Sequence, residues 1–177
     1  MKSKALCLLL VLLLAVSLAA CGSDEESFGN EQTVPLDLII DALRSGNVET
    51  YESAFPADFL NIYRSGYPDI DEIIGTLIGA GRNRDESVYG ADAEITYELL
   101  KSEPMPVNTL ATQIYYDSID EFLYYLPVDQ ISEARMLQIR VHRGGSFSES
   151  DRVLECTVLK FGGKWVLHPS LFGSLLN

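Results

Sequence analysis

After residue 33, apolar side chains first recur with the period of a helix. The first apolar stripe, at positions i, i+3, i+4 and i+7, consists of Leu36, Ile39, Ile40 and Leu43. Gly46 is a natural stop for this helix, and Asn47 can cap a second, short helix that ends at Pro56. Helical spacing continues from Ala57 to Gly66. The pattern therefore predicts a series of short helices at the start of the folded region.

A further helix is predicted to begin in the acidic run Pro68–Glu72. Asp69 and Glu72 have the spacing of a capping box, and carboxylates in a first turn suit the helix dipole. A calcium loop would need alternating ligands and a central glycine, which this run lacks. The apolar stripe of this helix consists of Ile70, Ile73, Ile74, Leu77 and Ile78. The glycines of Gly79–Glu86 then predict a loop, and this loop lacks the Gly-Lys-Ser/Thr ending of a phosphate-binding loop.

Further along the chain, alternation with a period of two replaces the helical period. Asp92–Ser102 alternates apolar and polar side chains, as a half-buried strand does. Asn108–Leu126 is ambiguous, because its apolar residues have a rough helical spacing before a stop at Pro127. The C-terminal third predicts three strands joined through the glycine pairs 144–145 and 162–163: Leu137–His142, Val153–Phe161 and Lys164–His168. Short connections between consecutive strands favour antiparallel pairing.

This order of elements is typical of an α+β fold. Helices come first, followed by one strand, a helical segment and an antiparallel meander. We expect the N-terminal helices to pack on one face of a curved antiparallel sheet. The length of residues 34–177 suits a single domain of this kind.

The first 21 residues have a pattern of their own. Lys2 and Lys4 precede an apolar run from Ala5 to Val16, and the segment closes with Leu18-Ala19-Ala20-Cys21. A positive start, an apolar core and small final residues are the parts of a secretory signal. The closing residues resemble a lipobox, the cleavage site of bacterial lipoproteins. The resemblance implies that residues 1–20 are a lipoprotein signal peptide and that Cys21 carries lipid, including palmitate-type acyl chains.

Two other interpretations of this segment are weaker. A transmembrane anchor would need roughly 20 apolar residues, more than the run provides. An ordinary secretory cleavage site prefers small residues on both sides of an arbitrary one, whereas bulky Leu18 precedes the two alanines here. We therefore expect a cell-membrane lipoprotein that faces outside the cytoplasm. Residues 21–33 are then the acylated cysteine and a disordered polar tether.

The charge balance excludes some partners. The chain has 26 acidic and 13 basic residues, and Lys2 and Lys4 leave with the signal peptide. Nucleic acid is not expected as a partner, because phosphate binding needs clustered Lys and Arg. Electrostatic attachment to anionic lipids is not expected either. The expected contact with the membrane is therefore made through acylated Cys21.

The cysteines and histidines predict neither a metal site nor a cofactor. Cys7 leaves with the signal peptide and Cys21 carries lipid, so Cys156 has no thiol with which to form a disulfide. A lone cysteine in the apolar stretch Val153–Phe161 is expected to be a buried, inert thiol. His142 and His168 are the two histidines, and neither belongs to a metal-ligand spacing.

Two short motifs resemble a known superfamily. The run Leu43-Arg44-Ser45-Gly46-Asn47-Val48-Glu49-Thr50-Tyr51 to Phe55-Pro56 and the closing Gly162-Gly163-Lys164-Trp165-Val166-Leu167-His168-Pro169 resemble small lipoproteins of the nuclear-transport-factor-two-like (cystatin-like α+β) superfamily. Asn47 stands where that family often has Asp. The resemblance implies a cone-shaped domain whose sheet wraps a pocket. It implies no single activity, because the fold supports isomerases, hydratases and binding proteins, and it carries over no catalytic residue.

Three functions are compatible with these features. The favoured one is a non-enzymatic ligand-binding or protein-interaction domain, tethered outside the cytoplasm. The alternative is an isomerase- or hydratase-like enzyme that acts on a small molecule in the cone pocket. Candidate lining residues for such a pocket are Tyr97, Tyr115, Arg140, His142 and Trp165. The third function is a partner-specific role with a cell-envelope protein, for which an exposed aromatic patch at Tyr115–Tyr125 would be the signature.

Overall fold

The helical half of the chain comes first and the strands follow it. The computed structural model describes residues 30–116 and 122–173. The principal helices are α2 (Val34–Ser45), α3 (Val48–Glu52), α4 (Ala57–Gly66) and α5 (Ile70–Tyr89), and short 3-10 turns are η1 (Asn30–Thr33), η2 (Val107–Thr109), η3 (Val128–Gln130) and η4 (Pro169–Leu171). The strands are β1 (Glu94–Pro104), β2 (Gln113–Tyr116), β3 (Phe122–Tyr125), β4 (Ile131–Gly144), β5 (Glu149–Phe161) and β6 (Lys164–Leu167).

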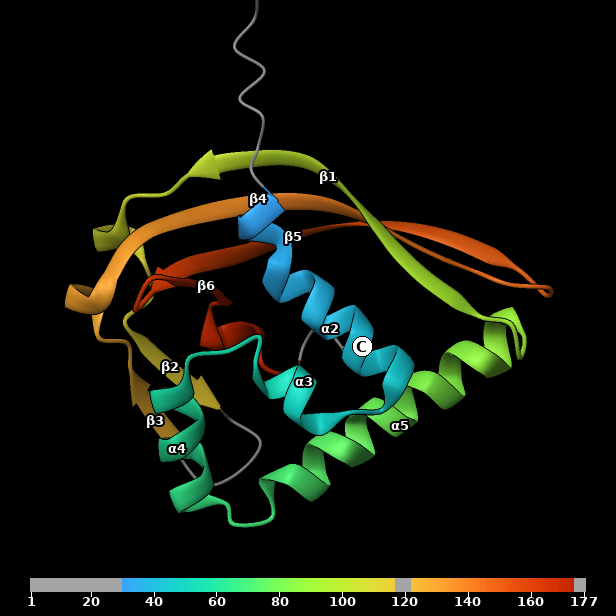
Figure 1. Ribbon diagram of the computed structural model, residues 1–177, viewed down its shortest axis with the longest axis horizontal. Helices are drawn as coiled ribbons and strands as arrows, with labels where there is room; N and C mark the ends of the chain where they lie inside the picture. The colour runs from blue at the N-terminus through green and yellow to red at the C-terminus, as the bar shows by residue number, and fades with distance from the viewer. Residues whose placement is uncertain (1–29, 117–121, 174–177) are drawn as a thin grey trace, which may run out of the picture.

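The strands β1, β4, β5 and β6 form one antiparallel sheet in the order β1-β4-β5-β6. Figure 1 shows the helices gathered on one side of this sheet. The α+β class and the packing of N-terminal helices on an antiparallel sheet, both predicted from the sequence, are thereby confirmed. A register shift between Leu99 and Lys101 interrupts the β1–β4 ladder, and bulges of this kind bend a strand.

The end of α2 and the start of α3 are set by the residues predicted to stop and cap these helices. Gly46 adopts a left-handed φ of 76° and its N–H donates to the carbonyl of Ala42 over 2.8 Å, so it ends α2 as predicted. Asn47 caps α3, because its Oδ1 accepts a 2.9 Å hydrogen bond from the N–H of Thr50. The prediction that α3 extends to Pro56 is wrong. The helix ends at Glu52, and Pro56 instead precedes the first residue of α4.

Helix α5 is much longer than predicted. It continues through Gly79–Glu86, which the glycines had marked as a loop, and ends at Tyr89. Gly79 and Gly81 keep ordinary backbone angles, and the helix stops only at Gly90, whose φ is 110°. A glycine inside a helix costs about 1 kcal/mol, which packing against neighbouring elements can offset. The predicted capping box also fails, since the side chain of Asp69 makes no capping hydrogen bond.

The helical interpretation of Asn108–Leu126 is wrong as well. The described part of this region contains η2 and a two-stranded hairpin of β2 and β3, while Ile119 lies outside the described residues. Both strands consist largely of aromatic and β-branched side chains, which suit a pleated surface better than a helix. Packing also favours the hairpin, because the Tyr124 hydroxyl donates to Asp58 of α4 over 2.7 Å.

The folded region begins slightly earlier than predicted. Residues 30–33 were assigned to the tether, but they form η1 and run directly into α2. Gln32 and Thr33 are buried, and the hydroxyl of Ser102 donates to Oε1 of Gln32 over 3.0 Å. The hydrogen bond to Ser102 of β1 satisfies the buried Gln32 side chain and holds η1 against the sheet, although the surrounding sequence is acidic and polar.

The core lies between the helices and the inner face of the sheet. Helix α2 contributes Leu36, Ile39 and Leu43, and α5 contributes Ile70, Ile74 and Ile78. An aromatic cluster fills the end near α3 and α4, with ring centroids 5.1 to 6.5 Å apart among Tyr51, Phe55, Phe59, Tyr63, Tyr124 and Phe172. Across residues 30–116 and 122–173, no helix is long and apolar enough to cross a membrane.

Candidate functional site

Among the residues proposed from the sequence, Tyr97 points toward the helices. Its hydroxyl donates to Oδ1 of Asp37 in α2 over 2.7 Å. Burial raises the pKa of Tyr97 to about 12, and the neighbouring Asp37 carboxylate acts in the same direction. Tyr97 therefore stays a neutral hydrogen-bond donor that fixes β1 against α2.

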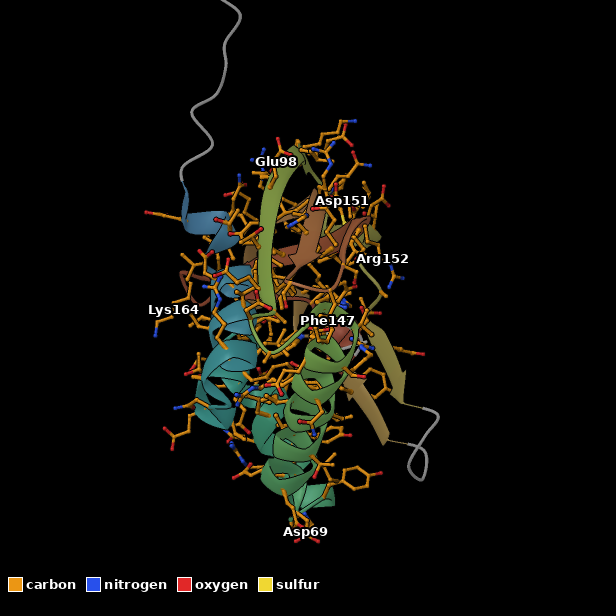
Figure 2. All side chains as sticks on the ribbon, turned by 90° about the vertical axis from the view of Figure 1, so that its right-hand side faces the viewer. Asp69, Glu98, Phe147, Asp151, Arg152 and Lys164 are labelled. Atoms are coloured by element: carbon orange, nitrogen blue, oxygen red, sulfur yellow. The ribbon has the colours of Figure 1, made fainter. Side chains whose placement is uncertain are left out.

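Arg140 and His142 lie on the opposite, outer face of the sheet. Arg140 forms an ion pair with Glu98, its neighbour across the β1–β4 ladder. His142 Nδ1 lies 2.8 Å from Oδ1 of Asp151, its neighbour across the β4–β5 ladder. Glu98 and Asp151 lie at the upper end of the molecule in Figure 2. Because side chains alternate between the faces of a strand, Arg140 and His142 point away from Tyr97, which pairs with Val141.

The remaining two candidates, Trp165 and Tyr115, lie on other strands than Tyr97, Arg140 and His142. Trp165 is half-buried on β6, where Nζ of Lys160 lies 5.7 Å from its ring centroid. The backbone of Tyr115 belongs to β2, but its side chain lies outside the described part of the structure. The described candidates do not converge on one cavity, and a ligand-binding role for any of them stays a prediction.

A different set of residues lines a cleft where α2, α5 and the start of β1 meet. The cleft has a volume of about 210 Å³. Its apolar walls include Leu43 and Ile95. Its charged lining comes from all three elements and consists of Arg44, Arg82, Asp85, Glu86 and Glu94. The site therefore combines guanidinium and carboxylate groups within one small space.

The two arginines of the cleft lie against backbone groups of β1 and of the end of α2. Nη2 of Arg44 donates to the carbonyl of Ile95 over 2.8 Å and so ties the end of α2 to β1. A methyl group placed on Gly46 would lie 3.1 Å from Nη1 of Arg82, so the glycine leaves room for that guanidinium. Arg82 thus lies beside the C-terminal end of α2, where the helix dipole favours a cation.

Asp85 joins the cleft to the sheet behind it. Its Oδ2 lies 3.7 Å from Nε of Arg143 on β4, and the two side chains are only 16% and 19% exposed. This separation is too long for a hydrogen bond. Among the described residues, Oδ1 of Asp85 and Nε of Arg143 are buried without a hydrogen-bond partner. A buried ion pair that is not closed by hydrogen bonds is costly, so a bound group that donated a hydrogen bond to Asp85 would reduce that cost.

A smaller apolar cavity adjoins the cleft. It has a volume of about 40 Å³ and is lined by the inner faces of α2, β1 and β4. Leu43 and Ile95 line both spaces, and Tyr97, Val141 and Arg143 complete the wall on the side of the sheet. The charged cleft and a pocket of methyl-group size are therefore neighbours.

Sequence reasoning missed the cleft because it assigned Gly79–Glu86 to a loop. In the helix that forms instead, Arg82, Asp85 and Glu86 fall at i, i+3 and i+4, which places them on one face. That spacing was visible in the sequence. The contribution of Arg143, which lies on β4, carries no local signal.

Other reactive groups lie elsewhere. Cys156 is buried as predicted, and its burial raises the pKa of the thiol to about 12. Within the part of the chain that the structure describes, no group of three or more His, Cys, Asp or Glu side chains could hold a metal ion.

Comparisons of the chain with protein families, with curated proteins and with solved structures give no significant match.

Proposed function

We propose that this chain is a lipid-anchored extracytoplasmic protein whose α+β domain binds a ligand without transforming it. The observation that carries the proposed location is the Leu18-Ala19-Ala20-Cys21 sequence behind a positive start and an apolar run. Two acyl chains on Cys21 would hold the protein stably at the membrane, because each buried methylene contributes about 0.8 kcal/mol. The chain between Cys21 and η1 then tethers the domain to the outer side of that membrane.

The cleft supports binding in preference to catalysis. Its described lining contains charged and apolar side chains but no Ser, Thr, Cys, His or Tyr. A hydroxyl, thiol or imidazole group for nucleophilic or acid–base catalysis is therefore absent from this described lining, whose reactive groups are carboxylates and guanidinium groups. A small concave site with a few charged groups beside apolar walls suits a binding protein.

An isomerase- or hydratase-like activity is the alternative, and Tyr97 is the observation that favours it. Tyr97 lines an apolar cavity and its hydroxyl stays neutral, as an oxyanion donor would in an enzyme of the nuclear-transport-factor-two-like type. The cavity of about 40 Å³ is too small for a substrate, and the hydroxyl is already bonded to Asp37. Binding in the larger charged cleft is therefore the better-supported function.

A cell-envelope protein is the second kind of partner. Tyr125 in β3 is 62% exposed, which fits the aromatic surface expected around Tyr115–Tyr125. One exposed aromatic side chain is common on soluble domains, so this surface gives weaker support than the cleft.

The anchoring is tested with Cys21→Ser, and Cys7→Ser serves as the matched control. The unchanged protein and the Cys7→Ser protein should both lose residues 1–20, gain the mass of a diacylglyceryl group and sediment with membranes. The Cys21→Ser protein should keep its full length and gain no lipid mass. Intact-protein mass spectrometry of membrane fractions reads all three. Lipid mass on the Cys21→Ser protein would show that the lipobox assignment is wrong.

A further inference from the structure

We propose that the cleft between α2, α5 and β1 binds a small zwitterion, namely an amino acid or a short peptide with a free ammonium and a free carboxylate. This inference rests on the proposed binding function and specifies its site and ligand class. It is carried by four features of the cleft: its unpaired charges of both signs, the open ion pair at its base, its volume and the apolar pocket beside it.

The cleft presents charges of both signs that are not used within the protein. In the described part of the chain, the side chains of Arg82, Glu86 and Glu94 form no ion pair or hydrogen bond. The guanidinium of Arg44 is only partly engaged, through Ile95 and a 3.9 Å approach to Asp41. A carboxylate on the ligand can therefore reach guanidinium donors, while its ammonium can reach carboxylates. Such charge-assisted hydrogen bonds are about twice as strong as neutral ones.

The sign pattern argues against ligands of a single charge. A simple anion would meet Asp85, Glu86 and Glu94 in the cleft, on a chain with twice as many acidic as basic residues. A simple cation would meet Arg44 and Arg82. A ligand that carries both charges satisfies both groups, and like-charge contacts are the usual means of rejecting the wrong ligand.

The pair of Asp85 and Arg143 gives the cleft a group that a ligand can complete. The two side chains approach to 3.7 Å without a hydrogen bond, and each has a buried polar atom without a partner among the described residues. Oδ1 of Asp85 also lies 3.8 Å from Nε of Arg84, again without a hydrogen bond. An ammonium that reached the Asp85 carboxylate would therefore add a hydrogen-bond donor that neither arginine supplies. The desolvation of Asp85 already present in the empty cleft would then be partly offset on binding.

The size of the cleft favours a ligand of about one or two residues. The cleft volume of about 210 Å³ is below the range of about 300–1,000 Å³ typical of drug-sized ligands. The adjoining cavity of about 40 Å³ has room for a methyl-sized group behind Leu43 and Ile95. A short apolar side chain, such as that of alanine, therefore fits best.

The test is isothermal titration of the full chain in detergent with four probes: alanine, alanyl-alanine, N-acetyl-alanyl-alanine and alanyl-alanine amide. The acetyl cap removes the ammonium, and the amide removes the carboxylate. We expect at least one uncapped probe to bind and each cap on the dipeptide to weaken binding by about 10-fold or more, because each removes a charge-assisted contact. Equal affinity for capped and uncapped dipeptide would overturn the proposal.

The variants Arg82→Gln and Glu86→Gln connect the ligand charges to the cleft. We expect Arg82→Gln to bind alanyl-alanine about 10-fold more weakly and to distinguish less between the acid and its amide. Glu86→Gln should in the same way distinguish less between the free and the acetylated amine. The matched controls are Lys164→Gln and Asp69→Asn, which remove one charge of each sign far from the cleft. Figure 2 shows Asp69 at the lower end of the molecule and Lys164 at its left edge.

The outcomes separate this inference from the anchoring. Circular dichroism confirms that each variant is folded before its affinity is interpreted. Unchanged affinity in both cleft variants, or no heat from any uncapped probe up to about 10 mM in the folded protein, would overturn the zwitterion site. A missing lipid on Cys21 would overturn the anchor and leave the measured affinities unaffected.

Discussion

His168 makes the stability of the fold depend on pH. The side chain is 3% exposed and precedes η4, where its Nδ1 accepts a 3.2 Å hydrogen bond from the N–H of Ser170. Its Nε2 lies 3.2 Å from the carbonyl of Ala111, which places the proton on that nitrogen in the neutral ring. Burial lowers the pKa of His168, and the Ala111 carbonyl opposes this shift only in part.

The sign of the effect follows from proton binding in the two states. The unfolded chain titrates His168 near its ordinary pKa of 6.5, whereas the folded protein keeps it neutral to lower pH. Below pH 6.5 the unfolded state therefore binds more protons than the folded one. The contribution of His168 is fully present above pH 6.5 and is lost as the pH falls through the folded pKa. Well below pH 6.5, the free energy of unfolding can fall by at most about 1.4 kcal/mol for each pH unit. Over the whole interval from about pH 7.5 to 5.5, the total loss is also at most about 1.4 kcal/mol, because the unfolded state takes up its proton only near pH 6.5.

The comparison of the unchanged protein with His168→Asn isolates this contribution. Asn keeps a side-chain acceptor for the N–H of Ser170 but does not titrate. Urea unfolding, followed through the fluorescence of Trp165, the single tryptophan, gives the free energy of unfolding at each pH. The stability advantage of the unchanged protein should shrink as the pH falls, by up to about 1.4 kcal/mol over this interval. A difference that stays constant with pH would refute the reasoning, because shifts from carboxylates cancel between the two proteins.

The same urea assay tests three further features. Gly145→Ala should destabilise the protein by about 1–3 kcal/mol, because the added Cβ would lie 2.4 Å from the backbone carbonyl oxygen of Tyr89. Gly79→Ala should stabilise it by about 0.5–1 kcal/mol, because its Cβ meets nothing within 4 Å in the middle of α5, and a loss of stability would contradict the helix. Asn47→Ala should cost about 1 kcal/mol through the lost cap of α3, and an unchanged midpoint would show that this cap is unimportant.

The parts of the fold that were predictable from sequence are those with local causes. The end of α2 at Gly46 and the cap of α3 at Asn47 each depend on neighbouring residues alone. The C-terminal strands were predictable because their alternation and their glycine turns recur over a short distance. The turn at Gly162 and Gly163 shows this directly, since both glycines have positive φ angles of 55° and 83°.

The errors lie where distant contacts decide the conformation. Local propensity favours a break at Gly79–Glu86, yet α5 continues and packs against α2 and α3. The region of β2 and β3 has an ambiguous local pattern. In the structure it forms strands, and β3 packs against α4. Burial of Gln32 against Ser102 likewise extends the folded region by a contact between residues 70 positions apart. Tertiary packing overrides propensity in each case.

The candidate site could be predicted from sequence even less well than the fold. The residues chosen as pocket-lining were polar or aromatic groups on strands, and the alternation of strand faces separates Tyr97 from Arg140 and His142. The cleft instead joins Arg44, Asp85 and, behind it, Arg143, which come from three distant segments. One local clue existed, namely the shared helix face of Arg82, Asp85 and Glu86.

The wall of the cleft is held by a clasp between the end of α5 and the β4–β5 turn. The N–H of Phe147 donates to the carbonyl of Tyr89 over 2.9 Å, and the N–H and hydroxyl of Ser146 both donate to Oδ1 of Asp92. These hydrogen bonds hold the pKa of Asp92 below its ordinary value. Gly145 permits the close approach, and the turn carries Phe147 toward the viewer in Figure 2.

This clasp decides how rigid the proposed binding site is. It fixes the last turns of α5, which carry Asp85 and Glu86, relative to β1, which carries Glu94 and Ile95. A site whose walls are fixed before binding avoids the entropy of ordering them, so a small ligand with few contacts can still bind measurably. If the cleft binds a zwitterion, Gly145→Ala should therefore weaken that binding although Gly145 does not line the cleft. Unchanged affinity in a destabilised Gly145→Ala protein would show that the cleft does not depend on the clasp.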